Sequence, residues 1–175
     1  MANTDTPRGF INPVTDHGGS PQITWVAGTT TKCYPGDALQ YSNGATESGQ
    51  VIPLVDAQTD IVGVCAGYHS GTDLAKMPVY SDLKNMTFEV QTDDATFTVG
   101  TLTILDIGQA YDVKVTTGDT TRLTSKHELM SSTDDAQFLI TELIDRPDND
   151  SALVDAKVRG RFVKITNIPA SQAVA

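Results

Sequence analysis

The sequence predicts an all-β body that follows an extended N-terminal arm. Short apolar segments with two-residue alternation follow one another at close spacing, and Gly, Pro, Asn and Asp lie between them. Threonine, whose branched β-carbon suits a pleated surface, is plentiful. No window holds an amphipathic helix longer than two turns. Together these observations favour a barrel or a sandwich of antiparallel strands.

The first segment, residues 1–22, is interpreted as an arm. Its proline and glycine content leaves no room for a helix and little for a ladder strand (Pro7, Gly9, Pro13, Gly18, Gly19 and Pro21). The sizeable apolar groups are few, so the segment is not expected to bury its own surface. It is either a disordered terminus or an arm that orders against another chain. In the second case we expect the contacts to come from Arg8, Phe10, Ile11 and Val14.

The body is expected to span residues 23–166. Its first half contains segments with strand character at 23–27, 37–42, 51–57, 60–68, 76–82 and 86–93. Pro53 indicates an edge or a bulge, because proline cannot donate to a ladder. Gly63 and Gly67, inside an apolar strand, indicate a tight corner or a close approach of backbones.

The second half of the body is less regular. Residues 96–119 are expected to form a strand, a loop that contains Gly108, and another strand. Residues 123–132 fit either a short strand or one helical turn. The last long strands are expected at 137–145 and 152–165, joined by a turn-rich linker, and residues 167–175 form a C-terminal tail.

Composition restricts the partners. The formal net charge is −10 and the pI is near 4.5, so the surface repels phosphates, and we expect neither nucleic acid nor a membrane as a partner. The start lacks a signal peptide and no apolar run could cross a bilayer, so synthesis in a cytosol is expected. Cys33 and Cys65 give no disulfide framework; they are either buried free thiols or a single bridge.

No pattern of catalytic, cofactor or metal-binding residues is visible. His17, His69 and His127 lack ligand spacing, and His127 is interpreted as a polar loop residue. The acidic segment 145–150 could supply oxygens to Ca²⁺, but its spacing favours a solvated hairpin turn. The serines lack a G-x-S-x-G context, and no phosphate-binding glycine loop occurs. We therefore expect no enzyme activity and no cofactor.

One charge pattern is an exception in this acidic chain. Lys157, Arg159 and Arg161 alternate with Val158, Gly160 and Phe162. On a strand, this spacing places the three cations on one face. We call these cations the basic stripe. It is either an ordinary solvated face or a surface that docks on carboxylates of a neighbouring subunit.

The order of several short blocks resembles a known family. The chain begins MANTDTPRGFINPV, continues with YPGDAL (34–39) and IVGVCAGY (61–68), and then has VYSD (79–82) and FEVQ (88–91). Further blocks are DIGQAYDV (106–113), SKHEL (125–129) and DRPDND (145–150). Each block is weakly specific, but the ordered set covers nearly the whole chain and is similar to head decoration, or cement, proteins of tailed phages.

The resemblance implies a β-barrel or β-tulip body and a structural role in the virion. It implies trimers, made in the host cytoplasm, that sit on the outer capsid surface and bridge subunits of the major capsid protein. The alternative is a β-barrel module of a phage tail or fibre that binds carbohydrate, for which exposed aromatic rings would be needed. A small hydrolase would rest only on His127 and scattered aspartates.

Overall fold

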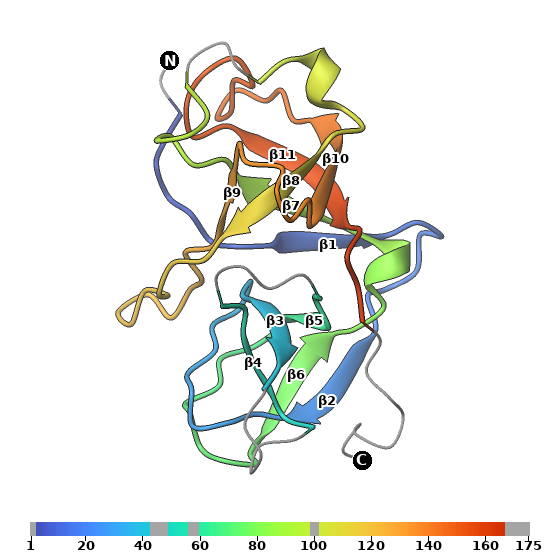
Figure 1. Cartoon of the computed structure of the whole chain (residues 1–175), viewed down its shortest axis with the longest axis vertical. Coiled ribbons are helices and arrows are strands. Elements are labelled where there is room, and N and C mark those ends of the chain that lie inside the picture. The colour runs from blue at the N-terminus through green and yellow to red at the C-terminus, as the bar shows by residue number, and fades with distance from the viewer. Residues whose placement is uncertain (1–2, 43–48, 56–59, 99–101, 167–175) are drawn as a thin grey trace.

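The chain folds into two antiparallel sheets with almost no helix, which confirms the all-β class (Figure 1). The computed structural model describes residues 3–42, 49–55, 60–98 and 102–166. The first sheet has six strands in the order β1 (Ile11–Thr15), β7 (Met86–Gln91), β11 (Lys157–Phe162), β10 (Phe138–Leu143), β8 (Ala110–Lys114) and β9 (Glu128–Met130). The second has five strands in the order β2 (Ile23–Ala27), β6 (Lys76–Tyr80), β5 (Gly63–Cys65), β3 (Ala38–Tyr41) and β4 (Val51–Pro53).

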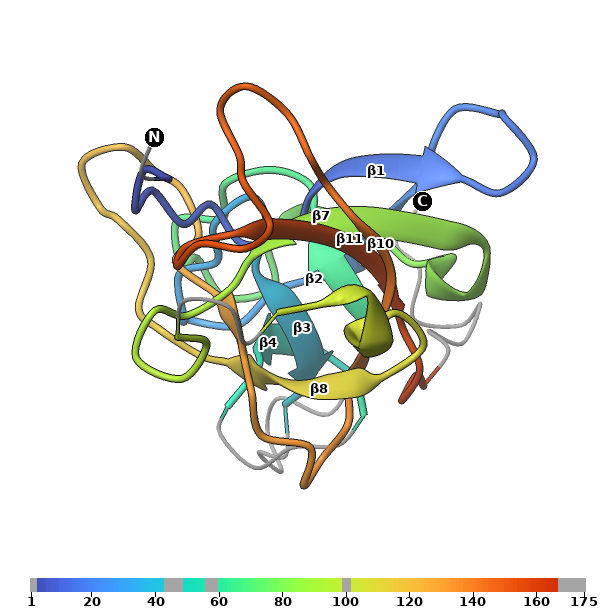
Figure 2. The same ribbon diagram turned by 90° about the horizontal axis from the view of Figure 1, so that it is seen from above.

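The sheets lie one above the other along the long axis of the molecule, and from above β3 is seen between β11 and β8 of the first sheet (Figures 1 and 2). The larger core joins the two sheets, since Phe88 and Phe138 from the first sheet share it with Ala38 and Val64 from the second. A smaller core belongs to the second sheet and contains Val26, Leu39, Met77 and both cysteines. In the described residues neither sheet closes into a barrel: β1 and β9 are edges of one, and β2 and β4 of the other.

Most predicted strands are present, and they are shorter than expected. Segment 60–68 keeps only β5 as a strand, and the predicted strand at 152–165 begins at Lys157. The close approach inferred at Gly63 is confirmed, because a Cβ atom there would lie 2.2 Å from Cγ1 of Val79. The undecided segment 123–132 contains a strand, β9.

The strand expected at the start of segment 96–119 is wrong in the described residues. Residues 94–97 form a turn, and the backbone N–H of Phe97 donates to the carbonyl of Asp93 at 2.8 Å. Phe97 is nevertheless buried, and its ring packs edge-on against Tyr111 with centroids 5.3 Å apart. Alternation alone misled the prediction, because a buried ring can reach the core from a turn as well as from a strand.

The N-terminal segment also differs from the expected arm. Residues 11–15 form β1, an edge strand that pairs antiparallel with β7. Phe10, just before β1, is 2% exposed and lies between Phe138 and Phe162, at centroid distances of 5.1 and 4.6 Å. The segment therefore completes the core of its own chain. The low apolar content hid this, since one well-placed ring is enough to anchor it.

Candidate functional site

Three of the sequence blocks meet at one buried junction between the sheets. The backbone N–H of Phe10 donates to the carbonyl of Gly36 at 2.9 Å, and the N–H of Ser125 donates to the carbonyl of Pro35 at 3.2 Å. Gly9 has a φ of +68°, and a Cβ atom there would lie 2.3 Å from the Gly36 oxygen. A side chain at Gly9 would thus force the segments apart. The glycines of these blocks are needed for close packing.

Asp37, Ser125 and His127 come together at this junction, but not as a catalytic triad. Asp37 accepts from the Tyr34 N–H at 2.7 Å, and Ser125 Oγ accepts from the backbone N–H of His127 at 3.1 Å. In a serine hydrolase the serine hydroxyl instead bonds to the histidine ring, and the site is open to substrate. Here all three side chains are buried, with 2% exposure or less. The arrangement holds the fold together.

His127 lies in a loop just before β9, as its interpretation as a polar loop residue expects, but the structure adds that it is buried. The ring is 1% exposed, and its Nε2 lies 3.6 Å from Oδ1 of Asp37. Burial lowers the pKa of His127 to about 4. Burial also raises the pKa of Asp37 to about 6, although hydrogen bonds from Ser125 and the Tyr34 N–H act in the opposite direction. No spacing rule could reveal this pair, since 89 residues separate its members.

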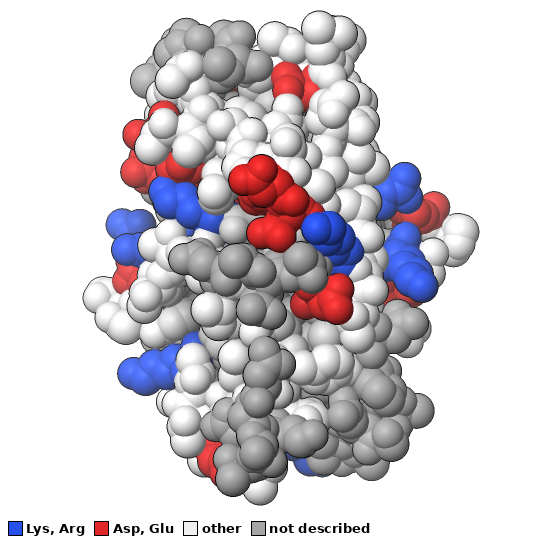
Figure 3. Space-filling model, viewed as in Figure 1, with Lys and Arg blue, Asp and Glu red and all other residues white. Residues whose placement is uncertain are grey.

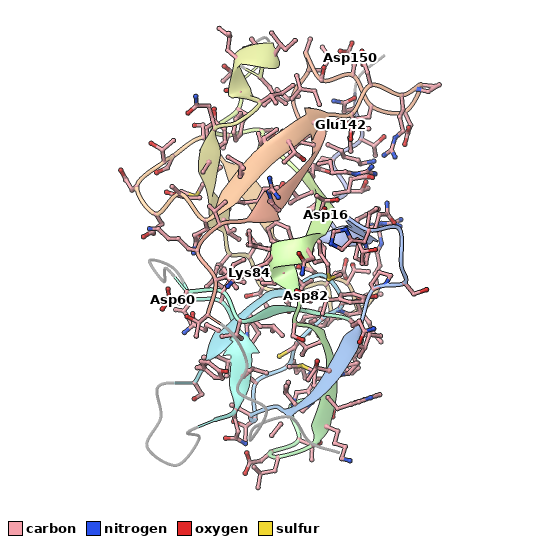
Figure 4. The ribbon with its side chains drawn as sticks, turned by 90° about the vertical axis from the view of Figure 1, so that its right-hand side faces the viewer. Asp16, Asp60, Asp82, Lys84, Glu142 and Asp150 are labelled. Carbon is pink, nitrogen blue, oxygen red and sulfur yellow. The ribbon has the colours of Figure 1, made fainter. Side chains whose placement is uncertain are left out.

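The basic stripe lies on one face of β11, as predicted, while Val158, Gly160 and Phe162 are buried. Its three cations have carboxylates of the same chain beside them: Lys157 lies 3.9 Å from Asp148, and Arg161 lies 3.8 Å from Asp16. Arg159 lies 3.7 Å from both Glu89 and Glu142. Figure 4 shows this face, with nitrogen-bearing side chains between the labelled Asp16 and Glu142. The chain itself thus supplies much of the counter-charge that a neighbouring subunit was expected to provide.

Glu89 is the centre of this charged face. It is 2% exposed and accepts from Arg146 at 2.6 Å and from Asn12 at 3.2 Å. Burial raises the pKa of Glu89, but the hydrogen bonds from Arg146 and Asn12 and the charges of Arg146 and Arg159 outweigh it. The pKa is therefore below its ordinary value. Because the carboxylate is ionised and paired, it joins β7 to the linker after β10.

That linker, the predicted turn at 146–151, is held by Asn149. Its carboxamide nitrogen donates to the carbonyls of Ile144 and Lys157, and its oxygen accepts from the Lys157 N–H at 2.6 Å. The turn itself is closed by a bridge between Arg146 and Asn149. In the described residues no group of three or more His, Cys, Asp or Glu side chains could hold a metal ion. The bridge and the bonds of Asn149 agree with the hairpin turn expected in this segment.

The described surface also carries an exposed apolar turn, which sequence reasoning missed. Ile104, Leu105 and Ile107 are 75%, 80% and 42% exposed, on and beside η2 (Ile104–Asp106). We call these three residues the apolar turn. A capping box between Thr103 and Asp106 fixes the backbone, and the Tyr111 hydroxyl donates to Asp106. The capping spacing T-x-x-D at 103–106 was the available signal.

The apolar turn lies at one end of the molecule, at the upper right of Figure 1. The surface there is largely uncharged, whereas acidic and basic side chains intermingle over the middle of the same face (Figure 3). Single exposed aliphatic side chains are common, but a group of them on adjacent positions is a candidate contact surface. A preordered backbone also loses little entropy on docking.

The other arm residues lie near the surface. Arg8 and Val14 are exposed, and Ile11 is half-buried on β1. The candidate rings for carbohydrate stacking are those of the tryptophan and the five tyrosines: Trp25 and Tyr68 are 48% and 40% exposed, whereas Tyr34, Tyr41, Tyr80 and Tyr111 are buried or half-buried. Cys33 and Cys65 are buried free thiols. No described helix is long and apolar enough to span a bilayer.

Comparisons of the chain with models of protein families, with curated proteins and with solved structures found no match.

Proposed function

We propose that this chain is a structural virion protein that decorates and stabilises the outside of a tailed-phage capsid. Its partners are the major capsid protein and further copies of itself, as a trimer, and it has no enzyme activity. It is made in the host cytoplasm and is then located on the outer surface of the capsid. The β-barrel or β-tulip form that the resemblance implies for the all-β body is part of this proposal.

The observation that carries the proposal is the apolar turn. Three aliphatic side chains project from a backbone fixed by the Thr103–Asp106 capping box, at an end of the molecule with little charge. An acidic chain that binds copies of itself or a shell needs such a surface, because like charges repel. The basic stripe, with Lys157, Arg159 and Arg161 partly exposed, adds orientation and partner selection. Several modest contacts made at once slow release from the shell.

The sequence blocks support the same proposal in a different way. Their residues make contacts within the chain: Gly9, Gly36 and Ser125 form the junction, and Glu89 and Arg146 join two elements. Residues used in this way hold a scaffold together. A scaffold that acts by presenting a binding surface fits a decoration protein better than an enzyme.

The test is binding to purified capsids that lack this protein. Wild type should co-sediment with the shells, and the Ile104→Ser/Leu105→Ser variant should bind at least ten-fold more weakly with its fold unchanged. Leu74→Ser is the matched control, because Leu74 is 67% exposed but lies beside the second sheet. Equal binding by all three proteins would show that the apolar turn is not part of the contact. No binding by wild type would refute the proposed function.

A second candidate, a carbohydrate-binding module, is favoured by one observation. Trp25, the single tryptophan of the chain, is 48% exposed on the edge strand β2. Sugar rings stack on exposed aromatic faces. Saturable quenching or a blue shift of tryptophan fluorescence on titration with host-surface polysaccharide would support this candidate. An unchanged spectrum would argue against the carbohydrate-binding candidate.

A further inference from the structure

The buried pair at the junction has hydrogen-bonding capacity that the fold does not use. Asp37 and His127 are 2% and 1% exposed, and Oδ1 of Asp37 has no hydrogen-bond partner in the described part of the chain. The nearest polar ring atom, Nε2 of His127, is 3.6 Å away, beyond a good hydrogen bond. Two titratable groups therefore face each other in an interior that strongly disfavours net charge.

The backbone determines which form of His127 fits. The N–H of Ala38, the first residue of β3, donates to Nδ1 at 3.2 Å. Nδ1 therefore carries no proton, and the neutral ring holds its proton on Nε2, toward Asp37. A proton added to Nδ1 would face the Ala38 N–H and break the hydrogen bond at the start of β3. The geometry keeps His127 neutral while the junction is intact.

Asp37 is in the opposite situation. One carboxylate oxygen already accepts from the Tyr34 N–H, and the Ser125 side chain favours the charged form of the carboxylate. Oδ1 has no hydrogen-bond partner in the described residues, so it is the oxygen that can take a proton. Two thiols, those of Cys33 and Cys65, lie near enough for the charge of Asp37 to raise their pKa. Burial raises the pKa of both thiols, that of Cys65 to about 12, so they remain uncharged. A proton that enters the folded junction thus has its best place on Asp37.

We propose that Asp37 and His127 form a proton-compensating pair, in which the folded chain takes up a proton on Asp37 over the same mildly acidic range in which the unfolded chain takes one up on His127. Folding then changes the total number of protons bound by this pair very little. The contribution of the pair to the free energy of unfolding therefore changes little between pH 7 and pH 4. This inference does not depend on the proposed function.

The two contributions have opposite signs. The pKa of Asp37 is about 6 in the folded chain and 3.8 ordinarily, so falling pH favours folding by up to roughly 160-fold. The pKa of His127 is about 4 in the folded chain and 6.5 ordinarily, so falling pH disfavours folding by up to roughly 300-fold. Between pH 7 and pH 4 the two effects on the folding constant nearly cancel. Replacing one residue should therefore reveal the pH dependence that the other contributes.

The experiment is urea unfolding from pH 7 to pH 4 for wild type, Asp37→Asn, His127→Asn and the double variant. Asparagine retains an acceptor for the Tyr34 N–H at position 37 and for the Ala38 N–H at position 127. Relative to wild type, acid should lower the folding constant of Asp37→Asn by about 100-fold and raise that of His127→Asn by about 100-fold. The double variant, and the control His17→Asn at an exposed histidine, should parallel wild type.

Single variants whose pH profiles parallel that of wild type would overturn the proposal. If a variant does not fold at pH 7, the wild-type chain still provides the test by NMR. The His127 ring should keep the neutral tautomer protonated on Nε2 down to about pH 4. A ring that titrates near its ordinary pKa in the folded chain would equally overturn the proposal.

Discussion

Replacing Phe10 by alanine should show whether the N-terminal segment belongs to the core. The ring is 2% exposed and lies between Phe138 and Phe162, with centroids 5.1 and 4.6 Å away. Its removal leaves a cavity among rings that cannot all move, because Phe162 also packs against Phe88 at 5.9 Å. Deletion of a fully buried phenylalanine side chain costs about 3–5 kcal/mol.

The assays are reversible urea unfolding and thermal unfolding, both followed by circular dichroism. For a chain of this length, about 1 kcal/mol changes Tm by roughly 2–4 °C, so Phe10→Ala should lower Tm by roughly 6–20 °C. The matched control is Val14→Ala in the same segment, where the side chain is 45% exposed. That control should change the free energy of unfolding by less than about 1 kcal/mol.

A Phe10→Ala variant that unfolds at the wild-type urea midpoint would refute the packing argument. The segment would then be a peripheral arm, as the sequence first indicated. A truncation that removes residues 3–15 sharpens the comparison, because it deletes β1 as well as the ring. It should lose the cooperative transition or shift it further than Phe10→Ala does.

Two further predictions concern the charged face and the linker, both measured by urea unfolding. Glu89→Gln should lower the free energy of unfolding by about 1.5–3 kcal/mol at pH 7, because it breaks a buried, charge-assisted bond to Arg146. Since the folded-state pKa of Glu89 is lowered, wild type begins to lose this contribution as pH falls below the ordinary value of 4.5 and loses it fully only below the folded-state pKa. The difference between the two proteins should therefore narrow as pH falls below 4.5, and a difference that stays constant or widens there would contradict the argument. Asn149→Ala should cost about 2–4 kcal/mol, because the carbonyls of Ile144 and Lys157 lose a donor inside the fold, and a loss below about 0.5 kcal/mol would show that the linker is held by other contacts.

Strand periodicity predicted much of this fold from sequence. In β11, Val158, Gly160 and Phe162 are buried while Lys157, Arg159 and Arg161 are partly exposed, as a two-residue period requires. Strand ends were less predictable, since neighbouring backbones determine where a ladder stops. Phe97 and Phe10 show the main limit: local pattern does not reveal whether a ring outside a regular strand finds a place in the core.

In the candidate sites, too, local patterns could be predicted from sequence and long-range contacts could not. The stripe was visible as an alternation, but its carboxylate partners come from β7, β10 and the segment after β1, so only the fold could reveal them. The pairing of Asp37 with His127 likewise depends on long-range contacts. The apolar turn was accessible in principle, because the capping residues Thr103 and Asp106 are three positions apart.

The most direct test of the account is electron microscopy of capsids with and without this protein, combined with the mass of the free protein by light scattering. The account predicts threefold clusters of density on the outer capsid surface and a solution mass three times the 18.7 kDa of the chain. The clusters should disappear from particles prepared with the Ile104→Ser/Leu105→Ser variant. Particles whose outer density does not change when the protein is removed, together with a monomeric mass at tens of micromolar, would contradict it.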